Sequence, residues 1–131
     1  MMKLRPPIAA CLAAATLVAA PAAQAYPVKT SGTTRATPQL AADIVARLSA
    51  YGKATHGCSF VFSAEMRVMP ASYVPRGPAA PVRARGGHYE QWSVNACGKR
   101  QLFQVGMWAS PRGGSDFAIT PLTSPQPLHR S

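Results

Sequence analysis

Residues 88–109, HYEQWSVNACGKRQLFQVGMWA, contain two runs of alternating apolar and polar residues on either side of Gly98. Such alternation is typical of half-buried β-strands, because successive side chains of a strand point to opposite faces. A turn of even length around Gly98-Lys99 would place Val94 opposite Phe103, so that both apolar sets meet on one side. This stretch therefore predicts an antiparallel hairpin with one buried face. The residues expected on that face are Glu90, Trp92, Val94, Ala96, Phe103, Val105 and Met107.

Residues 58–68 have the same period of two and predict a strand that ends before Pro70. Phe60 and Phe62 fall on its apolar face, which we expect to join the buried face of the hairpin. After the hairpin, residues 110–114 have the composition of a turn, and a last short strand is expected to begin near Phe117. The apolar positions of the first strand are Cys58, Phe60, Phe62, Ala64, Met66 and Val68.

Residues 38–52 carry the period of an amphipathic helix. Thr37 can cap its first turn, and Pro38 occupies the first helical position, where a missing N–H group has no cost. Gly52 is expected to end the helix. The apolar stripe repeats at a spacing of four residues, at Leu40, Ile44 and Leu48.

Together these elements predict an α+β fold, in which one N-terminal amphipathic helix packs on a small antiparallel sheet of about four strands. The last three strands would form a C-terminal meander. We expect a flexible leader over 26–37, a single domain over 38–122 and a disordered tail over 123–131. A Pro/Gly/Arg-rich loop over 70–87 would interrupt the domain.

The first 25 residues predict a cleaved signal peptide. Lys3 and Arg5 form a positive head, an apolar run follows, and Ala23-Gln24-Ala25 has the small-x-small pattern of a cleavage site. The run of about 13 apolar residues is shorter than the ~20 that a membrane-spanning helix needs, so we expect no stable membrane span. Cys11 offers a lipoprotein alternative, but most of the apolar run follows it. We therefore expect a periplasmic or secreted protein that begins near Tyr26.

Cys58 and Cys97 are the two cysteines that remain after such cleavage. An even pair in an exported chain predicts one disulfide. The alternatives are a catalytic thiol, with His56 or His88 as its base, or a metal ligand. A lone His-x-Cys lacks the second ligand pair of a structural zinc site, so we expect no bound metal.

The chain has 14 basic and 4 acidic residues and a formal net charge of +10. The 70–87 loop contains Arg76, Arg83 and Arg85 and no acid, which predicts an anion-binding surface. An ordinary solvated surface is the alternative. Export would separate the protein from nucleic acid, so the expected partner is an anionic envelope component or another envelope protein. The sequence does not indicate an oligomeric state.

His88, Glu90 and Trp92 lie two residues apart, and would therefore share one strand face. They could form the polar end of a ligand cleft. The alternative is that Glu90 lies at the margin of the sheet and pairs with an arginine. A carboxylate-pair mechanism would instead place Glu65 or Asp116 beside Glu90.

The segments Tyr89–Lys99, Phe103–Val105 and Gly113–Phe117 carry an E-x-W-x-V-x-x-C-G hairpin followed by a G-G-x-x-F turn. This arrangement resembles a group of small exported bacterial proteins of unknown function. The resemblance implies the hairpin and an envelope setting, and it implies no activity, cofactor or catalytic residue.

No Ser nucleophile elbow, Gly-rich phosphate loop or His-rich metal pattern occurs in the sequence. We therefore expect no cofactor and assign no catalytic residue. The function predicted from the sequence is that of an exported, non-enzymatic binding or interaction module. The alternatives are a small secreted hydrolase or thiol enzyme, and an inhibitor that presents the 70–87 loop to a secreted enzyme.

Overall fold

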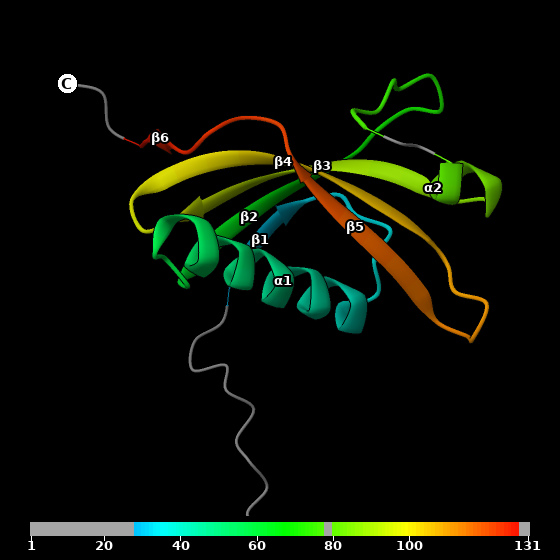
Figure 1. Cartoon of the computed structure of the whole chain (residues 1–131), viewed down its shortest axis with the longest axis horizontal. Coiled ribbons are helices and arrows are strands. Elements are labelled where there is room, and N and C mark those ends of the chain that lie inside the picture. Colours follow the sequence, from blue (N-terminus) through cyan, green and yellow to red (C-terminus); the bar gives the residue numbers. More distant parts are fainter. Residues whose placement is uncertain (1–27, 78–79, 129–131) are drawn as a thin grey trace, which may run out of the picture.

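The computed structural model describes residues 28–77 and 80–128 (Figure 1). The predicted signal peptide lies outside the described residues. Strands β1 to β5 lie in that order in one six-stranded sheet, and β6 pairs with the start of β4. The elements are β1 (Lys29–Gly32), α1 (Pro38–His56), β2 (Val61–Val68), α2 (Ala80–Ala84), β3 (His88–Ala96), β4 (Lys99–Ala109), β5 (Ser115–Pro121) and β6 (Gln126–Pro127).

Strand β1 runs parallel to β2, and all the other pairings are antiparallel. Parallel neighbours need a crossover connection, so α1 carries the chain from β1 to β2 across one face of the sheet (Figure 1). The predicted α+β class and the antiparallel meander are confirmed. The strand count and the position of the helix are wrong, because β1 precedes α1 and β6 follows β5.

At each end of helix α1, a backbone amide donates a capping hydrogen bond. The amide of Leu40 donates to Thr37 Oγ1 at 3.1 Å, as the capping pattern predicts. The helix continues past the expected stop at Gly52 and ends at Gly57, whose φ of 70° allows its amide to reach the Lys53 carbonyl. Gly52 is needed within the helix, because a Cβ atom at this position would overlap the Cys58 carbonyl oxygen. The Cys58 amide donates to the Gly52 carbonyl at 3.1 Å.

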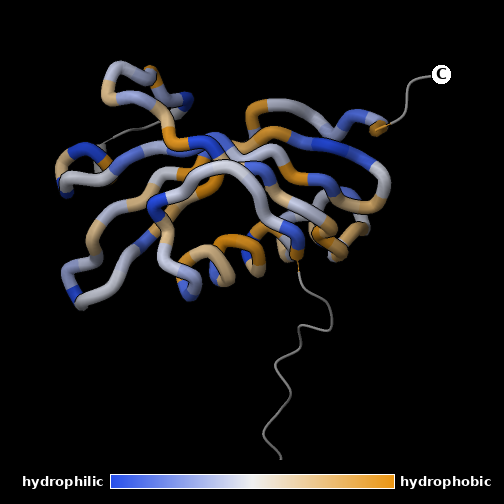
Figure 2. Tube along the Cα trace, turned by 180° about the vertical axis from the view of Figure 1, so that it is seen from behind, coloured by the Kyte–Doolittle hydropathy of each residue, from blue (hydrophilic) through white to orange (hydrophobic). Residues whose placement is uncertain are grey.

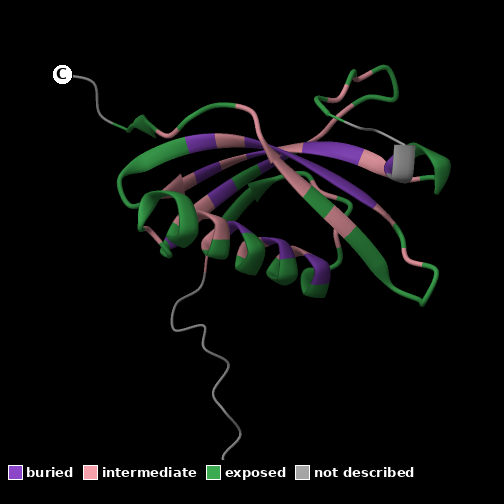
Figure 3. Cartoon of the chain, viewed as in Figure 1, coloured by how far each residue is buried: buried purple, intermediate pink, exposed green. Residues whose placement is uncertain are grey.

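The core lies between α1 and one face of the sheet. Figure 3 shows buried residues on the side of α1 that faces the sheet and along the central strands. Seen from behind, hydrophobic and hydrophilic residues alternate along these strands (Figure 2). The buried cluster consists of Leu40, Ile44, Leu48, Val61, Ala64, Met66, Trp92, Val94, Phe103, Val105 and Met107.

The prediction that Phe60 and Phe62 belong to this core is wrong. The pairing of β2 with β3 shifts between Val61 and Ser63, which leaves Phe62 as an extra residue in a β-bulge. The bulge turns Val61 into the core and leaves Phe62 49% exposed. Phe60 and Phe62 stack on each other outside the core, with ring centroids 6.4 Å apart.

The hairpin faces are as predicted, but the register differs by two residues. The turn consists of Cys97 and Gly98, with φ angles of 51° and 76°, which suit the type I′ turn that matches strand twist. Trp92 therefore lies opposite Phe103, and Val94 lies opposite Gln101. A shift of two residues preserves the side of the sheet on which each residue lies, so the buried set is unchanged.

The expected flexible leader is wrong for residues 29–32. These residues pair with β2 from Lys29 opposite Ser63 to Gly32 opposite Met66. All four are exposed, so no hydrophobic period marks this strand.

The expected disordered tail is likewise wrong for residues 123–128. Gln126 lies opposite Arg100 in the pairing of β6 with β4, and the Leu128 amide donates to the Gly98 carbonyl at 3.1 Å. Residues 129–131 lie outside the described residues.

The 70–87 segment packs on the sheet face opposite α1. Its short helix α2 buries Val82, for which Gly106 makes room, because a Cβ atom at Gly106 would lie 2.8 Å from Val82 Cγ2. The Tyr73 hydroxyl donates to Gln104 Oε1 at 2.8 Å. A segment expected to be a loop thus contains a short helix, and its described residues cover part of a second face. No helix among the described residues is long and apolar enough to cross a membrane.

Candidate functional site

Glu90 is fully buried, and its carboxylate is surrounded by hydrogen-bond donors. The Thr34 hydroxyl and the Trp92 indole N–H donate to Oε1 at 2.7 and 2.9 Å. The Arg35 amide donates to Oε2 at 2.8 Å, and His88 Nε2 lies 2.7 Å from the same oxygen. The prediction that Glu90 lies at the sheet margin and pairs with an arginine is wrong. Glu90 is buried, and Arg35 contacts it through the backbone amide and not through the guanidinium.

These contacts determine the charge of the group. Burial alone would raise the pKa of Glu90, but the hydrogen bonds from the Arg35 amide, His88, Thr34 and Trp92 together lower the pKa below its ordinary value. Glu90 is therefore an ionised carboxylate in the interior of the protein. One of its carboxylate oxygens lies within hydrogen-bond distance of His88, which is partly exposed at the surface.

His88 is the part of this network that reaches the surface, with 18% of its side chain exposed. It lines a groove of about 300 Å³ together with Arg35, Arg83 and Tyr89. The other wall is the turn at 69–71 that follows β2. Trp92 is fully buried and does not line the groove, so the predicted cleft of His88, Glu90 and Trp92 is not formed as a set.

Tyr89 lines the groove, but its hydroxyl oxygen is buried. Tyr89 is only 5% exposed, and its hydroxyl has no hydrogen-bond partner among the described residues. The Arg83 guanidinium lies over the ring, 5.5 Å from its centroid. Burial raises the pKa of Tyr89, and the Arg83 charge offsets this effect only in part. The Tyr89 hydroxyl is therefore a neutral group buried behind the groove, and it is not exposed to a ligand there.

The predicted arginine set does not form one cluster. Arg83 lines the groove and donates to the carbonyls of Ala71 and Tyr73. Arg76 lines a different surface hollow, where its guanidinium donates to the Leu122 carbonyl at 3.0 Å. Arg85 is exposed on α2's C-terminal side and lines neither hollow.

The predicted disulfide is confirmed. Cys58 and Cys97 are joined across 39 residues, with their Cα atoms 6.3 Å apart. The bond links the segment after α1 to the β3–β4 turn. Cys97 lies in this turn with a left-handed φ of 51°, so its side chain does not follow the alternation of the strand before it. Neither sulfur is a free thiol, so a thiol mechanism at these cysteines is not available while the disulfide is intact.

The carboxylates that a hydrolase would need are not brought together. Glu65 and Asp116 are exposed, whereas Glu90 is buried and fully engaged by donors. Among residues 28–77 and 80–128, no three His, Cys, Asp or Glu side chains are placed to hold a metal ion.

Sequence reasoning missed Thr34 and Arg35, which complete the site. The available indication was an acid on the apolar face of a strand, because a buried carboxylate requires donors from elsewhere in the chain. Nothing in a single sequence identified donors that lie 55 and 56 residues away. Comparisons with protein-family models, curated proteins and solved structures found no match for this chain.

Proposed function

We propose that this protein is an exported, non-enzymatic binding module for an anionic component of the cell envelope, and that the groove beside His88 is its contact site. The single observation that carries the proposal is the meeting of three basic residues, Arg35, Arg83 and His88, around one groove. Every one of these side chains can donate a hydrogen bond to an anion.

Electrostatics favour the same ligand class. Glu90 is buried behind His88 and is already saturated by donors. Arg35 and Arg83 line the groove, and none of the described residues that line it is Asp or Glu. The Arg83 guanidinium also donates to the carbonyls of Ala71 and Tyr73, so its remaining N–H groups are the ones that could reach a ligand. Cleavage after Ala25 would remove Lys3 and Arg5 from the net charge of +10 and leave 10 − 2 = +8, which would attract anionic molecules over a longer range.

The size of the groove limits what it can hold. A volume of about 300 Å³ is at the small end of ligand sites, so one phosphate or carboxylate group with its immediate surroundings fits. Envelope molecules that display such groups on a larger body include anionic lipids and lipopolysaccharide. The predicted signal peptide and the disulfide support this setting.

A titration of the purified protein with inorganic phosphate tests the proposal. Backbone amide resonances of Arg35, His88 and Tyr89 should shift in a saturable manner, and the affinity should decrease as salt increases. Arg35→Ala should weaken binding severalfold, because it removes the guanidinium and keeps the amide that donates to Glu90. Arg112→Ala, in the exposed turn after β4, is the matched control. Binding that is indifferent to salt and to Arg35→Ala would refute the proposal.

A second candidate function is inhibition of a secreted enzyme, and the geometry around Val74 favours it. The loop between β2 and α2 projects from the body of the protein (Figure 1). Val74 is 85% exposed between two anchored residues, Tyr73 and Arg76. The Tyr73 hydroxyl and the Arg76 amide each donate to Gln104 Oε1 at 2.8 Å, and the Arg76 carbonyl accepts from Gln104 Nε2 at 3.0 Å.

A loop fixed on both sides of an exposed apolar residue loses little entropy when it enters a partner's pocket. The test is inhibition of a panel of secreted hydrolases by the purified protein. Val74→Asp should abolish any inhibition without a change in unfolding free energy, and Leu128→Asp, at the exposed C-terminal end, is the control. Inhibition that survives Val74→Asp would exclude this loop as the contact.

A further inference from the structure

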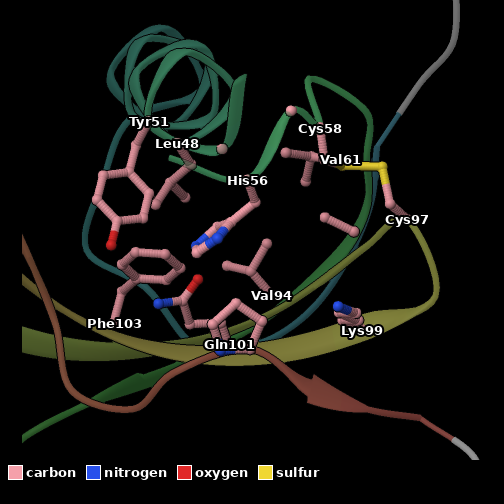
Figure 4. A pocket seen from close by; sticks show the side chains of 14 residues that line it. Leu48, Tyr51, His56, Cys58, Val61, Val94, Cys97, Lys99, Gln101 and Phe103 are labelled. Atoms are coloured by element: carbon pink, nitrogen blue, oxygen red, sulfur yellow. A yellow bond between two sulfur atoms is a disulfide. The ribbon is translucent and has the colours of Figure 1, made fainter. Parts of the chain in front are cut away.

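A second cavity, of about 280 Å³, lies at the opposite end of β3 from His88 (Figure 4). The C-terminal part of α1 forms one wall through Leu48, Tyr51 and His56. The sheet forms the floor, and the Cys58–Cys97 disulfide closes one side. Within β3, Tyr89 at the groove and Val94 at the cavity lie five residues apart, which is roughly 16 Å at about 3.3 Å per residue.

The interior of the cavity is apolar and aromatic. Leu48, Val61, Val94 and Phe103 are all buried core residues that also line it. The Tyr51 ring stands edge-on to Phe103, with centroids 5.5 Å apart and an interplanar angle of 90°. Such a surface favours a ring or a short hydrocarbon chain over a polar ligand.

The rim of the cavity is polar and basic. Lys99 is exposed at the start of β4, and Figure 4 shows His56 and Gln101 at the same cavity. None of the described residues that line the cavity is Asp or Glu. An aromatic wall alone would also suit a cationic ligand, but a basic rim without any carboxylate disfavours one.

We propose that this cavity binds a small amphiphilic carboxylate, with its ring or short chain against Phe103 and its head group at Lys99. The volume excludes a lipid with two long chains, because such ligands need sites well above the ~300 Å³ lower limit of drug-sized pockets. The site does not depend on the groove at His88, so the two ligands can be tested separately.

Octanoate is the probe for this site, and octylammonium is its matched cation with the same chain length. We expect octanoate to shift the amide resonances of Gly52, Gly57 and Gln101 and to leave those of Arg35 and His88 unchanged. Octylammonium should bind several times more weakly. Equal binding of the two probes, or octanoate shifts that do not map to the cavity, would overturn the proposal.

Variants at the rim and in the interior separate the two parts of the ligand. Lys99→Ala should weaken octanoate binding about two- to fivefold, the range for one exposed ion pair. Arg100→Ala, the exposed neighbour that does not line the cavity, should leave binding unchanged. Ala96→Leu should abolish binding, because the larger side chain fills the cavity.

Lys99→Glu keeps the test decisive if Ala96→Leu perturbs folding, because position 99 is exposed. This variant should lose the preference for octanoate over octylammonium. A preference that persists in Lys99→Glu would show that Lys99 does not hold the head group, and would also overturn the proposal.

Discussion

The Thr34 hydroxyl donates to Glu90 Oε1 at 2.7 Å across 56 residues of chain. Thr34 lies between β1 and α1, whereas Glu90 lies in β3, so the contact fixes the N-terminal crossover to the centre of the sheet. The Ala36 amide in turn donates to Thr34 Oγ1 at 3.0 Å, so the hydroxyl is held in place just before the helix begins. One buried charge thus fixes the segment that leads into α1.

Glu90→Gln should therefore destabilise the protein by about 2–4 kcal/mol, the range expected when charge-assisted hydrogen bonds are lost and buried donors are left unpaired. The amide group of glutamine would point one N–H toward donors that need an acceptor. Urea unfolding at neutral pH measures the effect. Glu65→Gln, at an exposed position of β2, should change the free energy of unfolding by less than about 0.5 kcal/mol. Similar values for the two variants would contradict the assigned role.

The lowered pKa of Glu90 predicts a loss of stability in acid. The group has its ordinary pKa of 4.5 in the unfolded chain and a lower pKa in the folded protein, so the unfolded chain binds the proton more readily. The contribution is fully present above pH 4.5 and is lost as pH decreases through the folded pKa. Melting temperatures between pH 3 and pH 7 should decrease below about 4.5, and Glu90→Gln should decrease less steeply. Parallel pH profiles for both proteins would exclude Glu90 as the source.

The buried face of the hairpin could be predicted from the sequence, because the alternation of side chains along each strand decides which residues face the core. Whether Val94 lies opposite Phe103 or Gln101 does not affect that face, so the wrong register had no consequence for the core. The left-handed conformation of Cys97 was not visible, because a non-glycine residue seldom adopts it.

Other features depend on contacts that a local pattern does not record. Strand β1 is polar and exposed, and it is held by backbone pairing with β2. The groove combines Arg35 and Arg83, which lie far apart in the chain, with His88. The buried acid at position 90 was visible, but its donors were not.

The β-bulge in β2 leads us to expect different losses of stability for substitutions at two apolar residues of this strand, Phe62 and Met66. Phe62→Ala should cost less than about 1 kcal/mol, because Phe62 is half exposed and its ring contacts the Lys29 ammonium and the Phe60 ring outside the core. Met66→Ala should cost about 2–5 kcal/mol, because Met66 is buried under α1. Chemical denaturation of both variants measures the difference. A larger cost at Phe62 would place that ring in the core and remove the bulge.

The disulfide leads to two predictions, one for the free energy of unfolding and one for the number of reactive thiols. Replacement of Cys58 and Cys97 by serine should cost about 3–4 kcal/mol in the loop-entropy model, given a closed loop of 39 residues. Alkylation of the unreduced mature protein should label no thiol, and alkylation after reduction should label two. Mass spectrometry of the same sample would locate the N-terminus and so test cleavage after Ala25. Two reactive thiols before reduction would revive the thiol-enzyme alternative.

Tyr89→Phe tests the cost of one buried hydroxyl and should separate stability from binding. A buried hydroxyl without a partner costs about 1–3 kcal/mol, so Tyr89→Phe should leave the free energy of unfolding unchanged or raise it. Because the hydroxyl is buried and not exposed in the groove, the same substitution should leave phosphate binding unchanged. Tyr73→Phe is the matched control, because the Tyr73 hydroxyl already donates to Gln104 Oε1 at 2.8 Å, so its loss should destabilise the protein. If Tyr89→Phe is destabilised as well, the hydroxyl stabilises the folded protein, and if the variant binds phosphate more weakly, the hydroxyl reaches the groove; either result would contradict the prediction.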